Sequence, residues 1–202
     1  MEGLHIHDIH FLYGVSQPTI ALIHQNKEED SWPFANPNGP NPFIHQRHLK
    51  TYELSLEKQK FTKVGWKLNN VDQKANMLIA VPEPYRGVII LGPESITYHN
   101  GASHHTIAPP NIQESNIVAY ARIDLEGWRY LLGDMAGNLF VCQRKSAEED
   151  KRANLSEVGR IHLGACLNVF RQGSLVVNSL GDSSIPHTDS ILFGKWEDFC
   201  QK

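Results

Sequence analysis

Residues 77–101, MLIAVPEPYRGVIILGPESITYHNG, decide the fold of this chain. They contain a short apolar run, a polar turn that ends at Gly87, a second apolar run that ends at Leu91-Gly92, and a further turn. Short runs of Val, Ile, Leu and Tyr separated by Gly, Pro and Asn are typical of β-strands joined by tight turns. Helical patterns are almost absent elsewhere. The same pattern of short apolar runs between turn residues predicts strands at 6–13, 19–24, 49–56, 77–81, 88–91, 95–99, 117–123, 129–132, 139–143, 161–163, 166–170 and 174–179.

The arrangement of residues 77–101 recurs in residues 117–144 and 166–184. Equivalent turn glycines are Gly87, Gly127 and Gly173, and the second strands end in Leu-Gly pairs at Gly92, Gly133 and Gly181. A repeat of roughly 40–50 residues with about four strands per unit is the signature of a β-propeller. We therefore predict an all-β fold, a partial WD-type β-propeller of about four blades of four antiparallel strands in an incomplete ring.

Two segments depart from the repeat. An earlier blade, from Ile6 to Trp66, is too long, and its excess between Asn26 and Gln46 is crowded with Pro and Asn. This composition favours an irregular, disordered insertion at 26–46. Residues 184–202 do not continue the repeat, so we predict a partial propeller over 1–183 followed by a divergent tail.

Composition sets broad limits on function. The chain has 202 residues, a net charge of −3 and 41% hydrophobic residues. This charge argues against a duplex-binding surface over the whole chain, although it leaves a local nucleic-acid contact open. The N-terminus does not resemble a secretory signal, and the apolar runs are far shorter than a membrane span. We expect an intracellular, soluble protein in which Cys142, Cys166 and Cys200 are buried thiols.

The histidines make a poor metal site. On a strand, His5 and His7 share one face and His10 lies on the other, while His104 and His105 point apart. We therefore expect no metal and no cofactor.

Acid–base catalysis is also disfavoured. Asp134 and Asp182 each follow a Leu-Gly pair in successive repeats, which is the behaviour of turn residues. No nucleophile elbow, metalloprotease motif or phosphate-binding glycine loop is present in the sequence. The prediction is that the protein is not an enzyme.

The turns between the first and second strands of successive repeats are the best candidate surface, because equivalent turns share one face of a propeller. They carry the candidate partner-binding residues Glu83, Tyr85, Arg86, Trp128 and Arg171, together with Phe170. Aromatic and Arg side chains are enriched at protein interfaces. Packing of the aromatic side chains between blades is the alternative interpretation.

Several long segments carry a family resemblance: LHIHDIHFLYG, PTIALI, HLKTYELSLEK, residues 77–101, IAPP and RYLLGDMAGNLF. They resemble the family of the large damaged-DNA-binding subunit, whose superfamily includes a polyadenylation-factor and a splicing-factor subunit. The resemblance covers Leu4–Gln25 and Arg47–Ser183. It implies a scaffold of several propellers, found in nucleus and cytoplasm, that links a cullin-RING E3 ubiquitin ligase to substrate-receptor proteins in DNA repair and protein turnover.

The expected partners are accordingly those receptors and the remaining propellers of a full-length member, with direct nucleic-acid contact uncertain and no membrane. The family's turn corresponding to Val169–Gly173 usually carries an exposed Tyr with an acidic and amide pair. Here only the glycine is kept, which puts docking at this turn in doubt. Alternatives are an RNA-processing paralogue, which the VPEPY and ESITYHNG runs disfavour, and a truncated splice product with no independent function.

Overall fold

The computed structural model describes residues 3–26, 46–108, 117–144, 155–173 and 191–196, and its regular elements within these ranges are all strands. Four sheets follow one another along the chain. We call them blade 1 (β1 Leu4–Phe11, β2 Thr19–Asn26, β3 Arg47–Ser55, β4 Lys60–Val71), blade 2 (β5 Met77–Ala80, β6 Val88–Leu91, β7 Ile96–His99, β8 His104–Ile107), blade 3 (β9 Ile117–Arg122, β10 Arg129–Asp134, β11 Asn138–Arg144, β12 Leu155–His162) and blade 4 (β13 Cys166–Gln172, β14 Ile191–Trp196).

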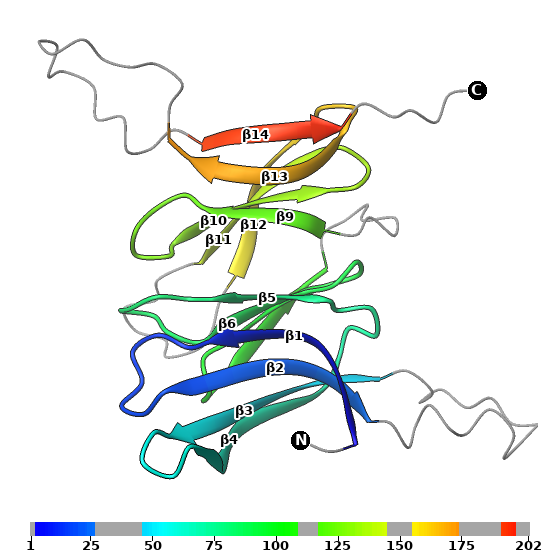
Figure 1. The fold of residues 1–202 in the computed structure, drawn as a ribbon. Helices are drawn as coiled ribbons and strands as arrows, with labels where there is room; N and C mark the ends of the chain where they lie inside the picture. Colours follow the sequence, from blue (N-terminus) through cyan, green and yellow to red (C-terminus); the bar gives the residue numbers. More distant parts are fainter. Residues whose placement is uncertain (1–2, 27–45, 109–116, 145–154, 174–190, 197–202) are drawn as a thin grey trace, which may run out of the picture.

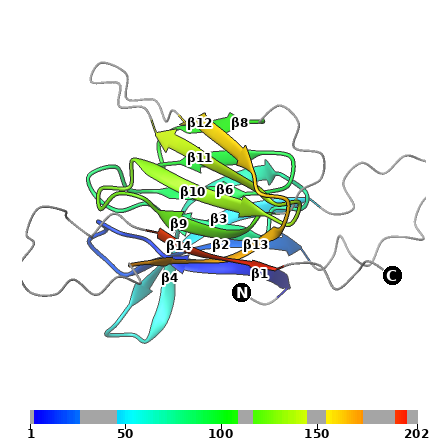
Figure 2. The same cartoon turned by 90° about the horizontal axis from the view of Figure 1, so that it is seen from above.

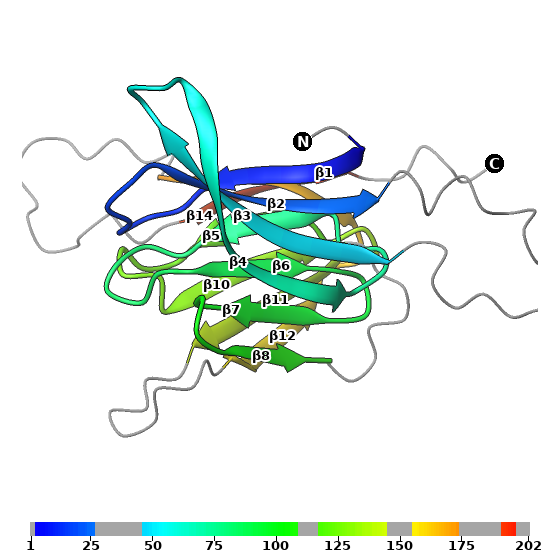
Figure 3. The same cartoon turned by 90° about the horizontal axis from the view of Figure 1, so that it is seen from below.

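Each sheet is antiparallel. In blades 1, 2 and 3 the four strands lie in sequence order from one edge of the sheet to the other. The blades are stacked one on the next (Figure 1). Their first strands lie along one side of the stack, and β8 and β12 lie on the opposite side (Figures 2 and 3). The prediction of a partial β-propeller is therefore confirmed, with three four-stranded blades and two described strands of a fourth.

The cores lie between the blades, as expected for sheets that bury both faces only by stacking. Ala21, Ile23 and Leu49 of blade 1 pack with Leu78 and Ile90 of blade 2. A second cluster joins blades 2 and 3 through Ile79, Leu91, Tyr98, Tyr130, Leu132 and Phe140, all at most 3% exposed. A third cluster joins Ala119 and Ala121 of β9 to Leu167 and Phe170 of β13.

The structure corrects several boundaries. Strands β4 and β8 were not predicted, and β12 begins at Leu155 instead of 161. Ile191–Trp196 forms β14, which pairs with β13 and so extends the fourth sheet into the segment predicted as a divergent tail. Within the expected insertion, Asn26 ends β2, while 27–45 lie outside the described residues, as do the predicted strand 174–179, Asp182 and Cys200.

The turn between β10 and β11 shows how the repeat is built. Asp134 is 1% exposed, and its carboxylate accepts hydrogen bonds from the Asn138 backbone N–H (2.8 Å) and side-chain amide (2.7 Å). Gly137 has a φ of 84°, which favours glycine. The expectation that Asp134 is a turn residue is confirmed. None of the described elements is a helix long and apolar enough to cross a membrane.

Candidate partner-binding face

The β5–β6 turn is anchored by a buried tyrosine and carries an exposed ion pair. The Tyr98 hydroxyl of β7 donates to the backbone carbonyls of Arg86 (2.9 Å) and Tyr85 (3.2 Å). On the solvent side of the turn, Arg86 Nη2 lies 2.7 Å from Glu83 Oε1, and both side chains are more than half exposed. The turn therefore has a fixed main chain and presents one positive and one negative charge to solvent.

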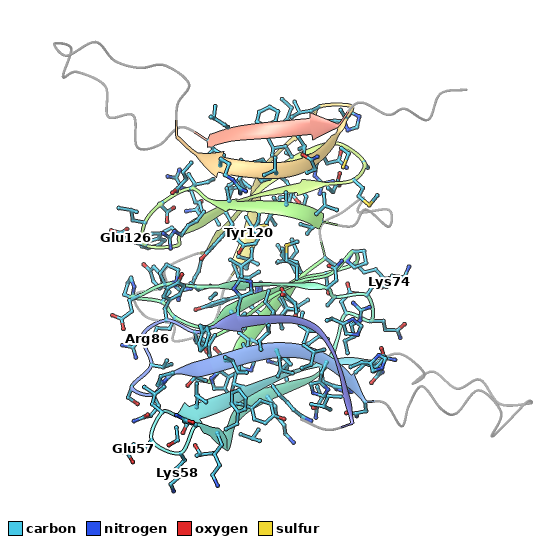
Figure 4. The ribbon with its side chains drawn as sticks, in the orientation of Figure 1. Glu57, Lys58, Lys74, Arg86, Tyr120 and Glu126 are labelled. Carbon is cyan, nitrogen blue, oxygen red and sulfur yellow. The ribbon has the colours of Figure 1, made fainter. Side chains whose placement is uncertain are left out.

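The β9–β10 turn fixes the neighbouring aromatic side chain. The Asp124 carboxylate accepts hydrogen bonds from the backbone N–H groups of Trp128 (2.5 Å) and Arg129 (2.9 Å). The Trp128 indole N–H donates to Glu126 Oε2 at 3.0 Å. Figure 4 shows Arg86 and Glu126 on the same side of the stack, together with Glu57 and Lys58 of the β3–β4 hairpin. The β5–β6 and β9–β10 turns form one face, which we call the turn face; the β3–β4 hairpin lies on the same side of the stack but is not part of it.

Tyr85 and Trp128 meet across the boundary between blades 2 and 3. Their ring centroids are 4.8 Å apart in an edge-to-face arrangement. The Arg144 guanidinium lies 3.6 Å from the centroid of the Tyr85 ring, a cation–π contact. Both aromatic side chains are partly buried. They do pack between blades, and an edge of each still reaches the surface of the turn face.

No sequence pattern marks Arg144 as part of this cluster. It is the last residue of β11, and its backbone N–H donates to the Trp128 carbonyl at 2.8 Å. Its contact with Tyr85 depends on how two blades are stacked, which the order of residues does not show.

Arg171 does not join this cluster. The structure places Phe170, Arg171 and Gln172 in strand β13, whereas the sequence predicted a turn there. Phe170 is buried in the core between blades 3 and 4, and the exposed Arg171 donates through Nη1 to the Phe170 carbonyl. Gln172 Nε2 donates to the Arg122 carbonyl at the end of β9. Arg171 therefore lies near the inner edge formed by the first strands.

A family model for the RSE1/DDB1/CPSF1 first beta-propeller matches residues 1–192. The chain belongs to this propeller family. DNA damage-binding protein 1 of Drosophila melanogaster is 35% identical over 196 residues, which cover 94% of this chain and 16% of the relative. DNA damage-binding protein 1b of Arabidopsis thaliana is 41% identical over 188 residues, 92% of this chain and 15% of the relative. The chain thus spans about a sixth of the length of these relatives.

The histidines and the buried cysteine that the sequence raised as possible site residues lie within strands of the blades. The described residues hold no group of three side chains suited to a metal ion, and His5, His7 and His10 are spread along β1 around a bulge. His105 Nδ1 accepts a hydrogen bond from the Leu155 backbone N–H (3.2 Å), which links β8 to β12. Cys142 is buried, and its burial raises the pKa of the thiol to about 12.

Proposed function

We propose that this chain is part of a non-catalytic scaffold that links a cullin-RING E3 ubiquitin ligase to substrate-receptor proteins. The role belongs to DNA repair and protein ubiquitination, in nucleus and cytoplasm. Support comes from the first-propeller family and from relatives that carry the name DNA damage-binding protein 1. The remaining propellers of a full-length scaffold are further partners in this proposal.

The observation that carries the proposal is the Tyr85–Trp128 contact on the turn face. Hot spots of protein interfaces are typically Trp, Tyr and Arg side chains held rigidly and ringed by polar groups. Here the aromatic pair is held by Arg144 and bordered by the Glu83–Arg86 ion pair. An exposed ion pair contributes little to folding stability, so its charges are available to a partner at low cost to the fold.

The test is affinity purification of the tagged full chain from nuclear extract, followed by mass spectrometry. We expect cullin-ligase receptors in the wild-type sample and a severalfold loss with Tyr85→Ala/Arg86→Ala. Because Tyr85 also packs between blades, Arg86→Ala alone provides a variant with an intact aromatic pair. Glu57→Gln/Lys58→Gln on the β3–β4 hairpin is the matched control on the same side of the stack (Figure 4).

Each outcome separates the candidate functions. Undiminished receptor recovery from both folded Arg86 variants would reject docking at the turn face. Recovery of polyadenylation or splicing factors in place of receptors would favour the RNA-processing paralogue. Chaperones alone would favour a product with no independent function.

A further inference from the structure

A groove of about 600 Å³ runs along the inner side of the stack, where the first strands of all four blades lie. We call it the inner groove. Its walls include His10 of β1, Tyr13 just after β1, Tyr120 and Arg122 of β9, Tyr130 of β10, and Arg171 of β13. Tyr120 is labelled near the centre of the stack in Figure 4. The turn face and the inner groove are therefore different surfaces, one at the strand ends and one along the inner strands.

Two buried donors line this groove without an acceptor. The Tyr130 side chain is 1% exposed, and its hydroxyl has no hydrogen-bond partner among the residues that the structure describes. Arg122 Nε is also buried and unpartnered within the same ranges. Tyr130 and Arg122 are direct partners in the β9–β10 ladder, so their side chains leave the sheet from adjacent positions on one face. Burial raises the pKa of Tyr130, and the positive charge of Arg122 acts in the opposite direction. Buried polar groups without partners are costly, so a matching acceptor would be bound favourably.

The charge of the groove points to an anionic acceptor. Arg122 and Arg171 line it, and its lining residues include no Asp or Glu. The Asp8 carboxylate, which acts on Tyr120 of the groove wall, already accepts a hydrogen bond from the Leu78 backbone N–H at 2.7 Å. The nearby Asp124 carboxylate already accepts from the backbone N–H groups of Trp128 and Arg129 and from the Arg129 side chain. Since guanidinium groups bind carboxylates through charge-assisted hydrogen bonds, a carboxylate suits the two buried donors.

The groove also offers main-chain groups. Strands β5 and β9 are the end strands of their sheets, so each has one edge without a neighbouring strand in the described part of the chain. Residues of both strands line the groove. An extended peptide can use such an edge through its own N–H and C=O groups, except at the Leu78 N–H, which donates to Asp8 Oδ2, and at the Arg122 carbonyl, which accepts from Gln172 Nε2. Nucleic acid is a poorer fit, because affinity for phosphates needs many cationic contacts and the chain carries a net charge of −3.

We propose that the inner groove binds an acidic peptide segment of a partner protein. One carboxylate displaces the Arg122 side chain far enough to reach Arg122 Nε and the Tyr130 hydroxyl, which have almost no accessible surface in the free chain, and a second pairs with the exposed Arg171. This inference is independent of receptor docking at the turn face.

The experiment is a fluorescence-anisotropy titration of the full chain with three fluorescein-labelled probes. These are a decapeptide rich in Glu and Asp, the same peptide with Gln and Asn, and a single-stranded oligonucleotide of ten nucleotides. The acidic peptide should bind at least tenfold more tightly than the amide peptide. Arg122→Gln/Arg171→Gln should weaken it about tenfold or more, since charge-assisted bonds are lost. Tyr130→Phe, which keeps the ring in the core, should weaken it about three- to tenfold.

Lys58→Gln/Lys74→Gln is the matched control, because it removes the same charge at exposed sites that do not line the groove (Figure 4). It should change affinity less than twofold, and circular-dichroism melts should show that every variant folds. Equal weakening by the lysine control, tighter binding of the oligonucleotide, or no binding of the acidic peptide would each overturn the proposal. Arg86→Ala should leave peptide binding intact, so failure of receptor docking and failure of this inference can be told apart.

Discussion

Replacement of Asp72 tests whether the connection between blades 1 and 2 is held by a single carboxylate. Asp72 follows β4, and its Oδ2 accepts hydrogen bonds from the backbone N–H groups of Glu94 (2.8 Å) and Ser95 (3.0 Å). Its Oδ1 accepts from the Lys74 backbone N–H at 2.9 Å. One side chain therefore ties the β4–β5 connection to the β6–β7 turn.

The expected cost follows from these bonds. A net contribution of about 1 kcal/mol for each of the three backbone N–H bonds at a partly exposed site gives a loss of about 3 kcal/mol for Asp72→Ala; the longer bond from the Ser95 hydroxyl (3.4 Å) adds little. Asp72→Asn keeps one acceptor oxygen and replaces the other by an NH2 group, so its cost should be about half as large. Glu94→Gln is the control, because its backbone N–H makes the bond and its side chain does not; its effect should stay within about 0.5 kcal/mol.

Urea denaturation of the full chain, followed by tryptophan fluorescence, measures these differences. The midpoint should fall in the order Glu94→Gln, Asp72→Asn, Asp72→Ala, with an unchanged m-value, because the surface exposed on unfolding stays the same. An Asp72→Ala midpoint equal to that of Glu94→Gln would show that the two blades are held together by core packing alone.

Three further outcomes are expected. Burial of His24, with smaller effects of nearby positive groups, lowers its pKa from 6.5 to about 4. As pH falls from 6.5 to 4, the unfolded chain binds a proton at His24 before the folded chain does, so up to about 3 kcal/mol of folding stability is lost over this window. His24→Phe should remove this part of the pH dependence in urea titrations. Cys142 should resist iodoacetamide at pH 8 until the chain unfolds, and rapid alkylation of the native protein would contradict its burial and its raised pKa. Gly133→Ala would bring a Cβ to 2.7 Å from the Leu167 Cβ and 3.1 Å from the Phe170 ring, so the melting temperature should fall by an amount equivalent to about 1–3 kcal/mol; an unchanged melt would refute close packing of blades 3 and 4.

The sequence predicts the inner strands well and the outer strands poorly, for a physical reason. Strand β6 is buried on both faces, so it reads as the apolar run VIIL. Strand β4, KFTKVGWKLNNV, lies at the edge of its sheet and is mostly exposed, so selection for apolar side chains is weak and no strand pattern survives. Strand β14, ILFGKW, was missed because it contains Gly and Lys and lies beyond the last copy of the repeat.

In the candidate site too, some residues could be predicted from the sequence and others could not. Glu83, Tyr85 and Arg86 were predicted correctly as a turn because Gly87 and Pro84 mark it in the sequence. Arg144 and Tyr130 act through neighbours that come from other strands, and their roles depend on how the strands and blades are placed in space. Local patterns predict which residues a turn presents. They do not predict what the neighbouring blade places against them.

The turn face and the inner groove meet at Gly127, and this decides how they can be tested. Gly127 belongs to the turn that carries Trp128, and it has a φ of 75°. A Cβ at this position would lie 2.7 Å from both the Tyr130 hydroxyl oxygen and Pro82 Cδ. Any side chain at residue 127 would therefore disturb the turn and the groove together. Arg86→Ala lies away from this contact, and Tyr130→Phe removes only the hydroxyl and adds no atom against the turn. Such substitutions can therefore show whether the two surfaces bind different partners.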